Sequence, residues 1–134
     1  MNARDVNTRA QRGAASVEFA LVALFVLVPM VMAVVDFGQM FNIRTVLSRA
    51  TEVGALAAAD GRDPTPLMRD AIARAGLSAD RLGVSVTPGY ATLPPGSSVT
   101  VDSTYDLAGL PILPWQAAIP SFSRLSAQAT ARRR

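Results

Sequence analysis

The residue types that carry out most enzyme chemistry are missing from this chain. Its 134 residues include no histidine, cysteine or lysine, and all 13 basic residues are arginine. This composition excludes serine–histidine and cysteine–histidine nucleophiles, thiolate and imidazole zinc sites, a lysine Schiff base and a P-loop lysine. Only carboxylates remain as candidates for catalysis or metal binding.

The paired carboxylates after the apolar run are poorly placed for such chemistry. Asp102 and Asp106 fall in an expected strand, where four residues separate them by about 13 Å, too far to share a proton or to flank a glycosidic bond. Asp60 and Asp63 occur in Asp60-Gly61-Arg62-Asp63-Pro64, which lacks the ligand count of a calcium loop and indicates a turn. We therefore expect no catalysis, no metal site and no cofactor.

Glu18 differs from these acids because a long apolar run follows it directly. From Phe19 to Val35 no side chain is charged or strongly polar. The run spans about 25 Å as a helix, and its flanks lengthen it enough to cross a hydrocarbon core of about 30 Å. A carboxylate inside a bilayer costs roughly 2.5–3.5 kcal/mol at the centre and usually has a function and a partner. The alternative is an acid near a helix N-terminus, favoured by the helix dipole and wetted at the interface.

The residues before the run are basic. This segment contains three arginines, Arg4, Arg9 and Arg12, and one acid, Asp5. Short positive flanks stay in the cytoplasm, so the N-terminus is expected inside and the residues after about Asn42 outside the membrane. A secretory signal has a similar plan, but this run is longer than the usual apolar region of a signal peptide.

The net charge of +3 does not predict nucleic-acid binding. Three arginines belong to the N-terminal leader and three form the C-terminal Arg132-Arg133-Arg134. The sequence contains no basic stripe with interleaved aromatic residues, so we expect no nucleic-acid partner.

The predicted fold class is α+β. A long N-terminal transmembrane helix extends into a stem and runs from about Ala14 to Ala59, with a kink expected at Pro29. A short helix and a small three-stranded antiparallel sheet follow. Three regions result: a cytoplasmic leader (1–13), the transmembrane helix with its stem (14–60) and a small α+β head (61–134). The small residues of the stem suit either a packing face for neighbouring proteins or a thin core helix.

Turn and periodicity signals place the elements of the head. Asp60-Gly61 ends the long helix, and Thr65-Pro66 predicts the cap and the first position of the short helix, which Gly76 closes. Its expected apolar face comprises Leu67, Ala71, Ile72 and Ala75. Alternating residues predict strands at Val84 and Val86, from Val99 to Tyr105, and from Phe122 to Thr130.

The sequence from Leu107 to Trp115 is apolar but too rich in proline for a regular element. It suits a loop folded over the sheet edge. It also suits a contact with a partner or a membrane surface through Ile112, Leu113 and Trp115.

Two N-terminal segments resemble TadE-like proteins. The first is Arg12-Gly13-Ala14-Ala15-Ser16-Val17-Glu18-Phe19 with the hydrophobic helix after it, and the second is Asp36-Phe37-Gly38 with the stem from Arg49 to Ala59. TadE-like proteins are minor pilins, or pseudopilins, of the tight adherence (Flp) pilus, a branch of the type IV filament systems. The resemblance is specific over roughly residues 9–61.

The resemblance implies processing and assembly. A membrane-embedded prepilin peptidase would cut on the cytoplasmic side between Gly13 and Ala14, which makes Glu18 the fifth residue of the mature chain. Glu18 and Phe19 are the implied assembly residues, because a neighbour's Glu18 could neutralise the new amine of Ala14 in lipid. The implied location is the bacterial inner membrane, crossed once, with a periplasmic head.

The implied partners are other minor pilins, including TadF-like ones, the major pilin, the peptidase, an inner-membrane assembly platform and membrane lipid. Ordinary type IV pilins have a phenylalanine after the glycine, and this chain has Ala14 there. TadF-like proteins share the same N-terminal plan, so either assignment stays open. A different hypothesis is an uncleaved signal-anchor protein whose periplasmic head binds a ligand or a partner.

Overall fold

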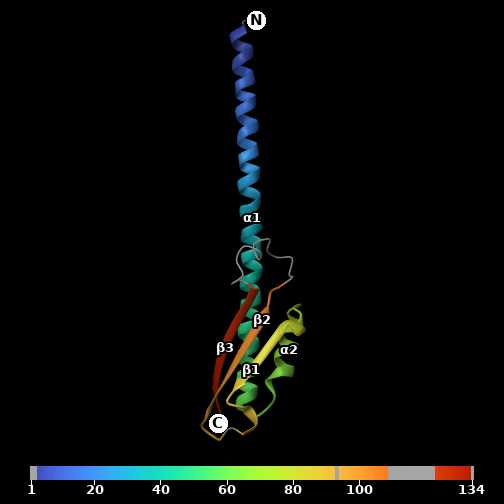
Figure 1. The fold of residues 1–134 in the computed structure, drawn as a ribbon, viewed down its shortest axis with the longest axis vertical. Coiled ribbons are helices and arrows are strands. Elements are labelled where there is room, and N and C mark those ends of the chain that lie inside the picture. The colour runs from blue at the N-terminus through green and yellow to red at the C-terminus, as the bar shows by residue number, and fades with distance from the viewer. Residues whose placement is uncertain (1–2, 93, 109–122, 134) are drawn as a thin grey trace. The chain divides into compact units, whose positions relative to one another are not determined.

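The computed structural model describes residues 3–92, 94–108 and 123–133. In these residues the order of elements is α1 (Ala3–Ala59), α2 (Pro64–Arg74), the 3-10 turn η1 (Ala79–Arg81), β1 (Leu82–Thr87), η2 (Tyr90–Thr92), β2 (Ser98–Asp106) and β3 (Arg124–Arg132) (Figure 1). The expected α+β class is confirmed. The chain divides into two compact units, Met1–Gly38 and Gln39–Arg134, and α1 contributes residues to both.

Helix α1 begins earlier than the sequence predicted. The expected start was about Ala14, and the helix starts at Ala3, so most of the basic leader is helical. Gly13 is the only glycine or proline in this stretch, and a helix tolerates a single glycine at a cost of about 1 kcal/mol. Pro29 lies inside α1 without ending it, and the kink expected there stays a prediction.

The second unit is built on a three-stranded antiparallel sheet in the order β1-β2-β3. In its register Ser103 of β2 lies opposite Val84 of β1 and Ala127 of β3. β3 starts and ends two residues later than predicted, because its pairing continues to Ser98 opposite Arg132. The predicted alternation is present: every second residue of β3 from Leu125 is half-buried and the others are exposed.

The C-terminal half of α1 forms one wall of the core of this unit. Its buried residues Ile43, Leu47, Ala50 and Gly54 recur at the three- and four-residue spacing that defines one face of a helix. Ile43, Leu47 and Ala50 belong to one cluster with the inward side chains of β2, Val99, Val101 and Tyr105. The small residues of the stem are also buried. Of the two interpretations of these residues, a packing face for neighbouring proteins or a thin core helix, their burial supports the core helix.

Two buried hydroxyl groups join α1 to the middle of the sheet. Thr51 Oγ1 lies 2.5 Å from Ser103 Oγ, and the two groups are also within reach of the carbonyl oxygens of Leu47 (2.7 Å) and Ala127 (3.2 Å). Each hydroxyl has one proton, so only two of these three bonds form at once. The link satisfies both polar groups inside an otherwise apolar interface.

The start of α2 corrects the sequence prediction. The cap was expected at Thr65 with Pro66 in the first turn, whereas the cap is Asp63 and Pro64 occupies the first helical position. The Asp63 carboxylate accepts a hydrogen bond of 2.9 Å from the backbone N–H of Thr65, satisfying one of the donors left unpaired at a helix start.

The apolar face of α2 also differs from the expected one. The helix buries Pro64, Met68 and Ile72, while Leu67 is 38% exposed and Ala75 is exposed. The buried set recurs every four residues and so forms one ridge. Met68 is fully buried, and it lies so close to α1 that a Cβ added at Gly54 would be 2.8 Å from its Cγ.

Glycines end both helices as predicted. Gly61 has φ +76°. The backbone N–H groups of Gly61 and Arg62 donate hydrogen bonds to the carbonyl oxygens of Ala58 and Ala57, respectively. Gly76, with φ +77°, ends α2 in the same way. The backbone N–H of Leu77 donates a hydrogen bond of 3.1 Å to the carbonyl oxygen of Ile72. This pairing is the Schellman arrangement, and its left-handed residue favours glycine.

We predict that Gly54→Ala destabilises the second unit by about 1 kcal/mol. Alanine favours a helix by about 1 kcal/mol, but the added methyl group overpacks the site against buried Met68. The measurement is the temperature at which the detergent-solubilised full chain loses its resistance to a protease.

Gly38→Ala is the matched control, because nothing lies within 4 Å of a Cβ at that position. The temperature at which the Gly38→Ala chain loses its protease resistance should not fall. Adding Met68→Val to Gly54→Ala should recover part of the stability that Gly54→Ala loses. A Gly54→Ala chain as stable as the Gly38→Ala chain would contradict the close packing of α1 against α2.

Candidate functional site

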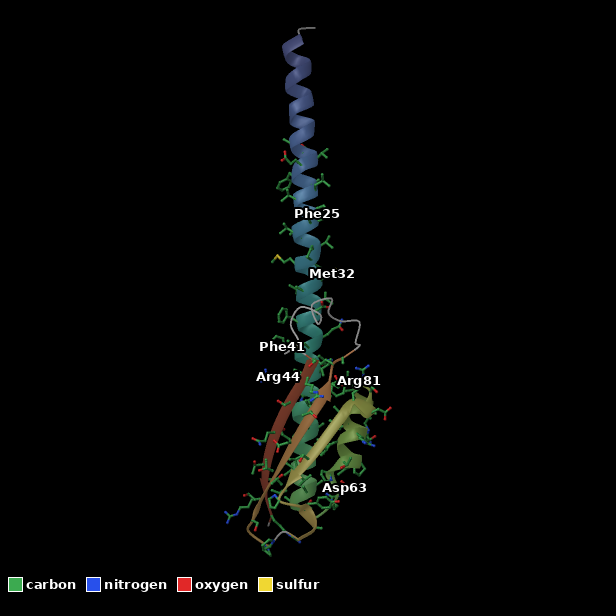
Figure 2. The ribbon with its side chains drawn as sticks, viewed as in Figure 1. Phe25, Met32, Phe41, Arg44, Asp63 and Arg81 are labelled. Carbon is green, nitrogen blue, oxygen red and sulfur yellow. The ribbon has the colours of Figure 1, made fainter. Side chains whose placement is uncertain are left out.

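The first unit carries an apolar helix that nothing in the described structure covers. One described helix, within Ala15–Ala59, is long and apolar enough to cross a membrane, and none of its most apolar window is buried. Phe25 and Met32 project from it in Figure 2. Exposed apolar side chains occur on all sides of this stretch, which is what lipid around the whole helix requires. The segment therefore has the character of a membrane anchor.

Glu18 and Phe19 stand at the start of this apolar stretch. Both are exposed, Phe19 to 75%. No described side chain forms an ion pair with Glu18. Side chains are described from Ala15 onward, and among these the nearest basic residue is Arg44, about 39 Å away along an ideal helix, too far to pair with Glu18. Gly13 and Ala14 lie in the regular backbone of α1, one turn before Glu18.

Asp36 is a second acid in the same unit, at the other end of the apolar run. Its exposed fraction is 9%, and no described residue forms a hydrogen bond or ion pair with it. The sequence singled it out only within the family-like segment. An acid directly after 17 apolar residues, with its nearest cation at Arg44, was the signal that could have drawn attention to it.

The carboxylates that the sequence paired in and next to the head have local structural partners. Asp102 accepts a hydrogen bond of 2.7 Å from Gln128 on the neighbouring strand, and Asp106 accepts one of 2.8 Å from the backbone N–H of Ala108. Asp60 forms an exposed ion pair with Arg62. Among the described residues no three acids gather in a way that could hold a metal ion.

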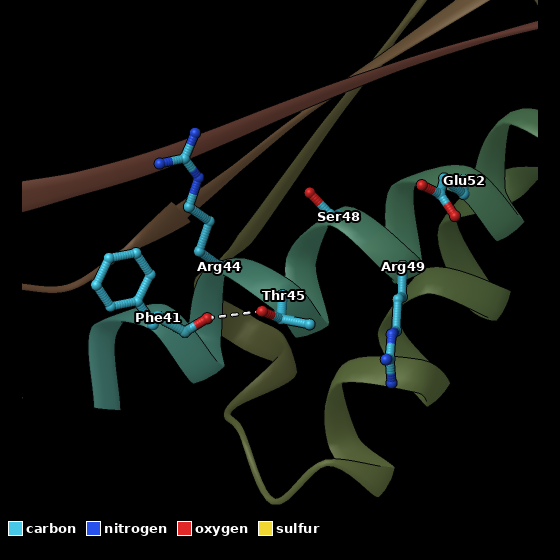
Figure 3. A pocket seen from close by; sticks show the side chains of 6 residues that line it. All are labelled: Phe41, Arg44, Thr45, Ser48, Arg49 and Glu52. Atoms are coloured by element: carbon cyan, nitrogen blue, oxygen red, sulfur yellow. Dashed lines mark hydrogen bonds between the residues drawn. The ribbon is translucent and has the colours of Figure 1, made fainter. Parts of the chain in front are cut away.

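A shallow hollow of about 440 Å³ lies on the exposed side of α1 in the second unit. The lining residues that the structure describes all come from this helix: Phe41, Arg44, Thr45, Ser48, Arg49 and Glu52 (Figure 3). The sequence analysis did not single out the charged ones. Their grouping becomes visible once the opposite face is known to be buried against the sheet.

The remaining predicted contact residues, Ile112, Leu113 and Trp115, lie outside the described residues. Their proposed contact with a partner or membrane surface stays a prediction.

Comparison with known families decides what kind of segment the first part of α1 is. Residues 13–56 match the family model of TadE-like proteins. The N-terminal segment of this chain is TadE-like. The match begins at Gly13, includes Glu18 and the whole apolar run, and ends at Leu56 inside α1, so the sequence resemblance is confirmed there.

The TadE-like match does not extend to α2 or to the sheet. No curated protein and no solved structure matches the chain. The match is thus limited to the segment from Gly13 to Leu56, and the long apolar helix in that segment indicates a membrane anchor.

We predict that replacing both Asp102 and Asp106 by asparagine changes the stability of the head by less than about 0.5 kcal/mol. Asparagine keeps an oxygen that accepts the hydrogen bonds from Gln128 and Ala108, and both sites are at the surface. The measurements are the melting temperature and the amount of pili on the cells. Asp102→Ala, which removes the acceptor, is the control for the structural role. Loss of pili in the double asparagine variant at a normal protein level would instead reveal a need for the carboxylate charge.

Proposed function

We propose that this chain is a membrane-anchored minor pilin that helps to start, prime or decorate a tight adherence pilus. The observation that carries the proposal is the TadE-like segment, which starts at Gly13, places Glu18 five residues later and continues into an unburied apolar helix. In this proposal the head acts through protein contacts and not through catalysis.

Processing between Gly13 and Ala14 is the first step of the proposed function. The leader holds Arg4, Arg9 and Arg12, and positive charge of this kind keeps a flank in the cytoplasm. A prepilin peptidase acting there would remove all three arginines and leave a single cation, the new amine of Ala14. The head would then lie in the periplasm.

The pairing of Glu18 with an Ala14 amine is the second step. Each of these charges is costly in lipid when alone, and the cost falls when they pair. Among the side chains described from Ala15 onward, none forms an ion pair with Glu18. Cleavage at Gly13 would remove the leader arginines, so a neighbouring subunit could then supply the cation. Such a pair would also fix the axial position of one subunit against the next.

The remaining partners follow from the same assignment: other minor pilins, including TadF-like ones, the major pilin and an inner-membrane assembly platform. The minor-pilin assignment is favoured over a small major pilin by the second unit, because α2 and three strands follow the anchor.

One observation favours a second candidate function. The family match ends at Leu56, so nothing in the comparisons characterises α2 and the sheet. An uncleaved signal-anchor protein with a head that binds a periplasmic ligand or partner would show the same structure. The two candidates differ in the start of the mature chain.

We predict that Glu18→Leu leaves membrane insertion and cleavage intact but reduces the number of assembled pili at least tenfold. The substitution removes the charge that would pair with the Ala14 amine and makes the helix more apolar. Pili are counted by electron microscopy, and the processed chain is measured by mass spectrometry of membranes.

Two variants make the Glu18 experiment specific. Glu18→Asp keeps the charge and should retain a measurable fraction of pili, and Asp80→Leu, which removes an exposed acid of the head, should leave pili at the normal level. If Glu18→Leu cells assemble pili at the normal level, the pairing account is wrong.

A further inference from the structure

The exposed face of α1 in the second unit has the composition of a docking surface. We call it the stem face and define it by the six residues that line the hollow: Phe41, Arg44, Thr45, Ser48, Arg49 and Glu52. Phe41 is 61% exposed, although it lies on a helix whose opposite face is fully buried. The stem face extends over about 17 Å of helix, or three turns.

The arrangement of charges round the helix is specific. With about 100° between successive residues, Phe41, Thr45, Ser48 and Glu52 form a central stripe about 60° wide. Arg44 and Arg49 lie about 140° apart, one on each side of that stripe. In Figure 3 these two side chains project to opposite sides of α1.

The charges of the stem face have no partners in the described structure. No described residue forms an ion pair with Arg44, Arg49 or Glu52, whereas Arg62 pairs with Asp60 and Arg74 with Asp70 on the same unit. The Thr45 hydroxyl donates to the carbonyl oxygen of Phe41 at 2.9 Å, so it is already satisfied. The stem face therefore presents two unpaired cations on either side of a narrow, partly apolar stripe.

We propose that the stem face binds an amphipathic helix of another protein, with acidic residues on both sides of a small or apolar stripe. In paired helices, charged residues on both sides of an apolar stripe determine which partner binds. Arg44 and Arg49 would each meet a carboxylate, and the partner's central stripe would cover Phe41. Glu52 lies at the C-terminal end of the stripe and would need a hydrogen-bond donor or a cation from the partner there. The axial distance between the two arginines is about 7.5 Å, so the acids of the partner helix must be about one and a half turns apart.

Charge complementarity argues against a second copy of this chain as the occupant. Each stem face holds two arginines and one glutamate, so two copies would bring four arginines and two glutamates into one interface. Any stagger of the copies leaves at least two arginines without an acid. The proposal concerns the second unit alone, and it holds whether or not Gly13 is a cleavage site.

A single thiol can report on the stem face, because the native chain contains no cysteine. Ser48→Cys places a thiol in the hollow, and Ser126→Cys places one on the exposed face of β3 as the matched control. The experiment compares the rate of labelling by N-ethylmaleimide in intact cells and in purified, detergent-solubilised full chain. We expect labelling of the Ser48→Cys chain to be at least tenfold slower in cells, with little change for Ser126→Cys.

Charge variants decide what protects the thiol. Adding Arg44→Glu with Arg49→Glu should abolish the protection, and adding Arg44→Lys with Arg49→Lys should keep most of it. Both arginines are exposed, so the fold should tolerate the changes, and the protease-resistance temperature checks this. If the double glutamate variant does not fold, Arg44→Gln with Arg49→Gln replaces it, and loss of protection is again expected.

Three results would overturn the proposal. Equal labelling in cells and in purified protein would mean that no partner covers the stem face. A disulfide-linked dimer of the Ser48→Cys variant under mild oxidation would mean that a second copy is the occupant. Protection that survives the charge reversal would mean that the covering group is not an acidic helix.

Discussion

The head depends on the packing of the C-terminal half of α1 against the inner face of the sheet. Without α1, three short strands and one helix of three turns would bury little apolar surface. Leu47 of α1 and Val101 and Tyr105 of β2 are all buried in one cluster, and the hydroxyls of Thr51 and Ser103 join the two walls. The same helix that is apolar enough to enter a membrane thus supplies the core of the folded head.

This double use explains how side chains are distributed along α1. In the first unit apolar side chains are exposed all round, as lipid would require, whereas from Ile43 onward one face is buried and the other is polar. Small residues on the buried face let β2 and Met68 approach closely, and Gly54 is the clearest case. The polar face retains charges that the fold does not use. Those charges, like Glu18 at the other end, fit contacts made with other chains.

The α+β class and the three strands could be predicted, because period-two alternation and turn glycines are local signals. The start of α2 could not, since Asp63-Pro64 and Thr65-Pro66 both satisfy the capping rule, and burial of Pro64 distinguishes them only in the folded chain. The core role of the stem depended on Met68, which the sequence did not single out. Of the candidate site, Glu18 was evident from its position before an apolar run. Arg44 and Arg49 form a pair only once the buried face of α1 is known.

The N-terminal sequence and intact mass of the membrane-extracted protein test the central claim most directly. They should be measured in cells with and without the prepilin peptidase. A processed filament subunit predicts a chain that begins at Ala14 when the enzyme is present and at Met1 when it is absent. A chain that begins at Met1 in both would contradict the account and favour an uncleaved signal anchor.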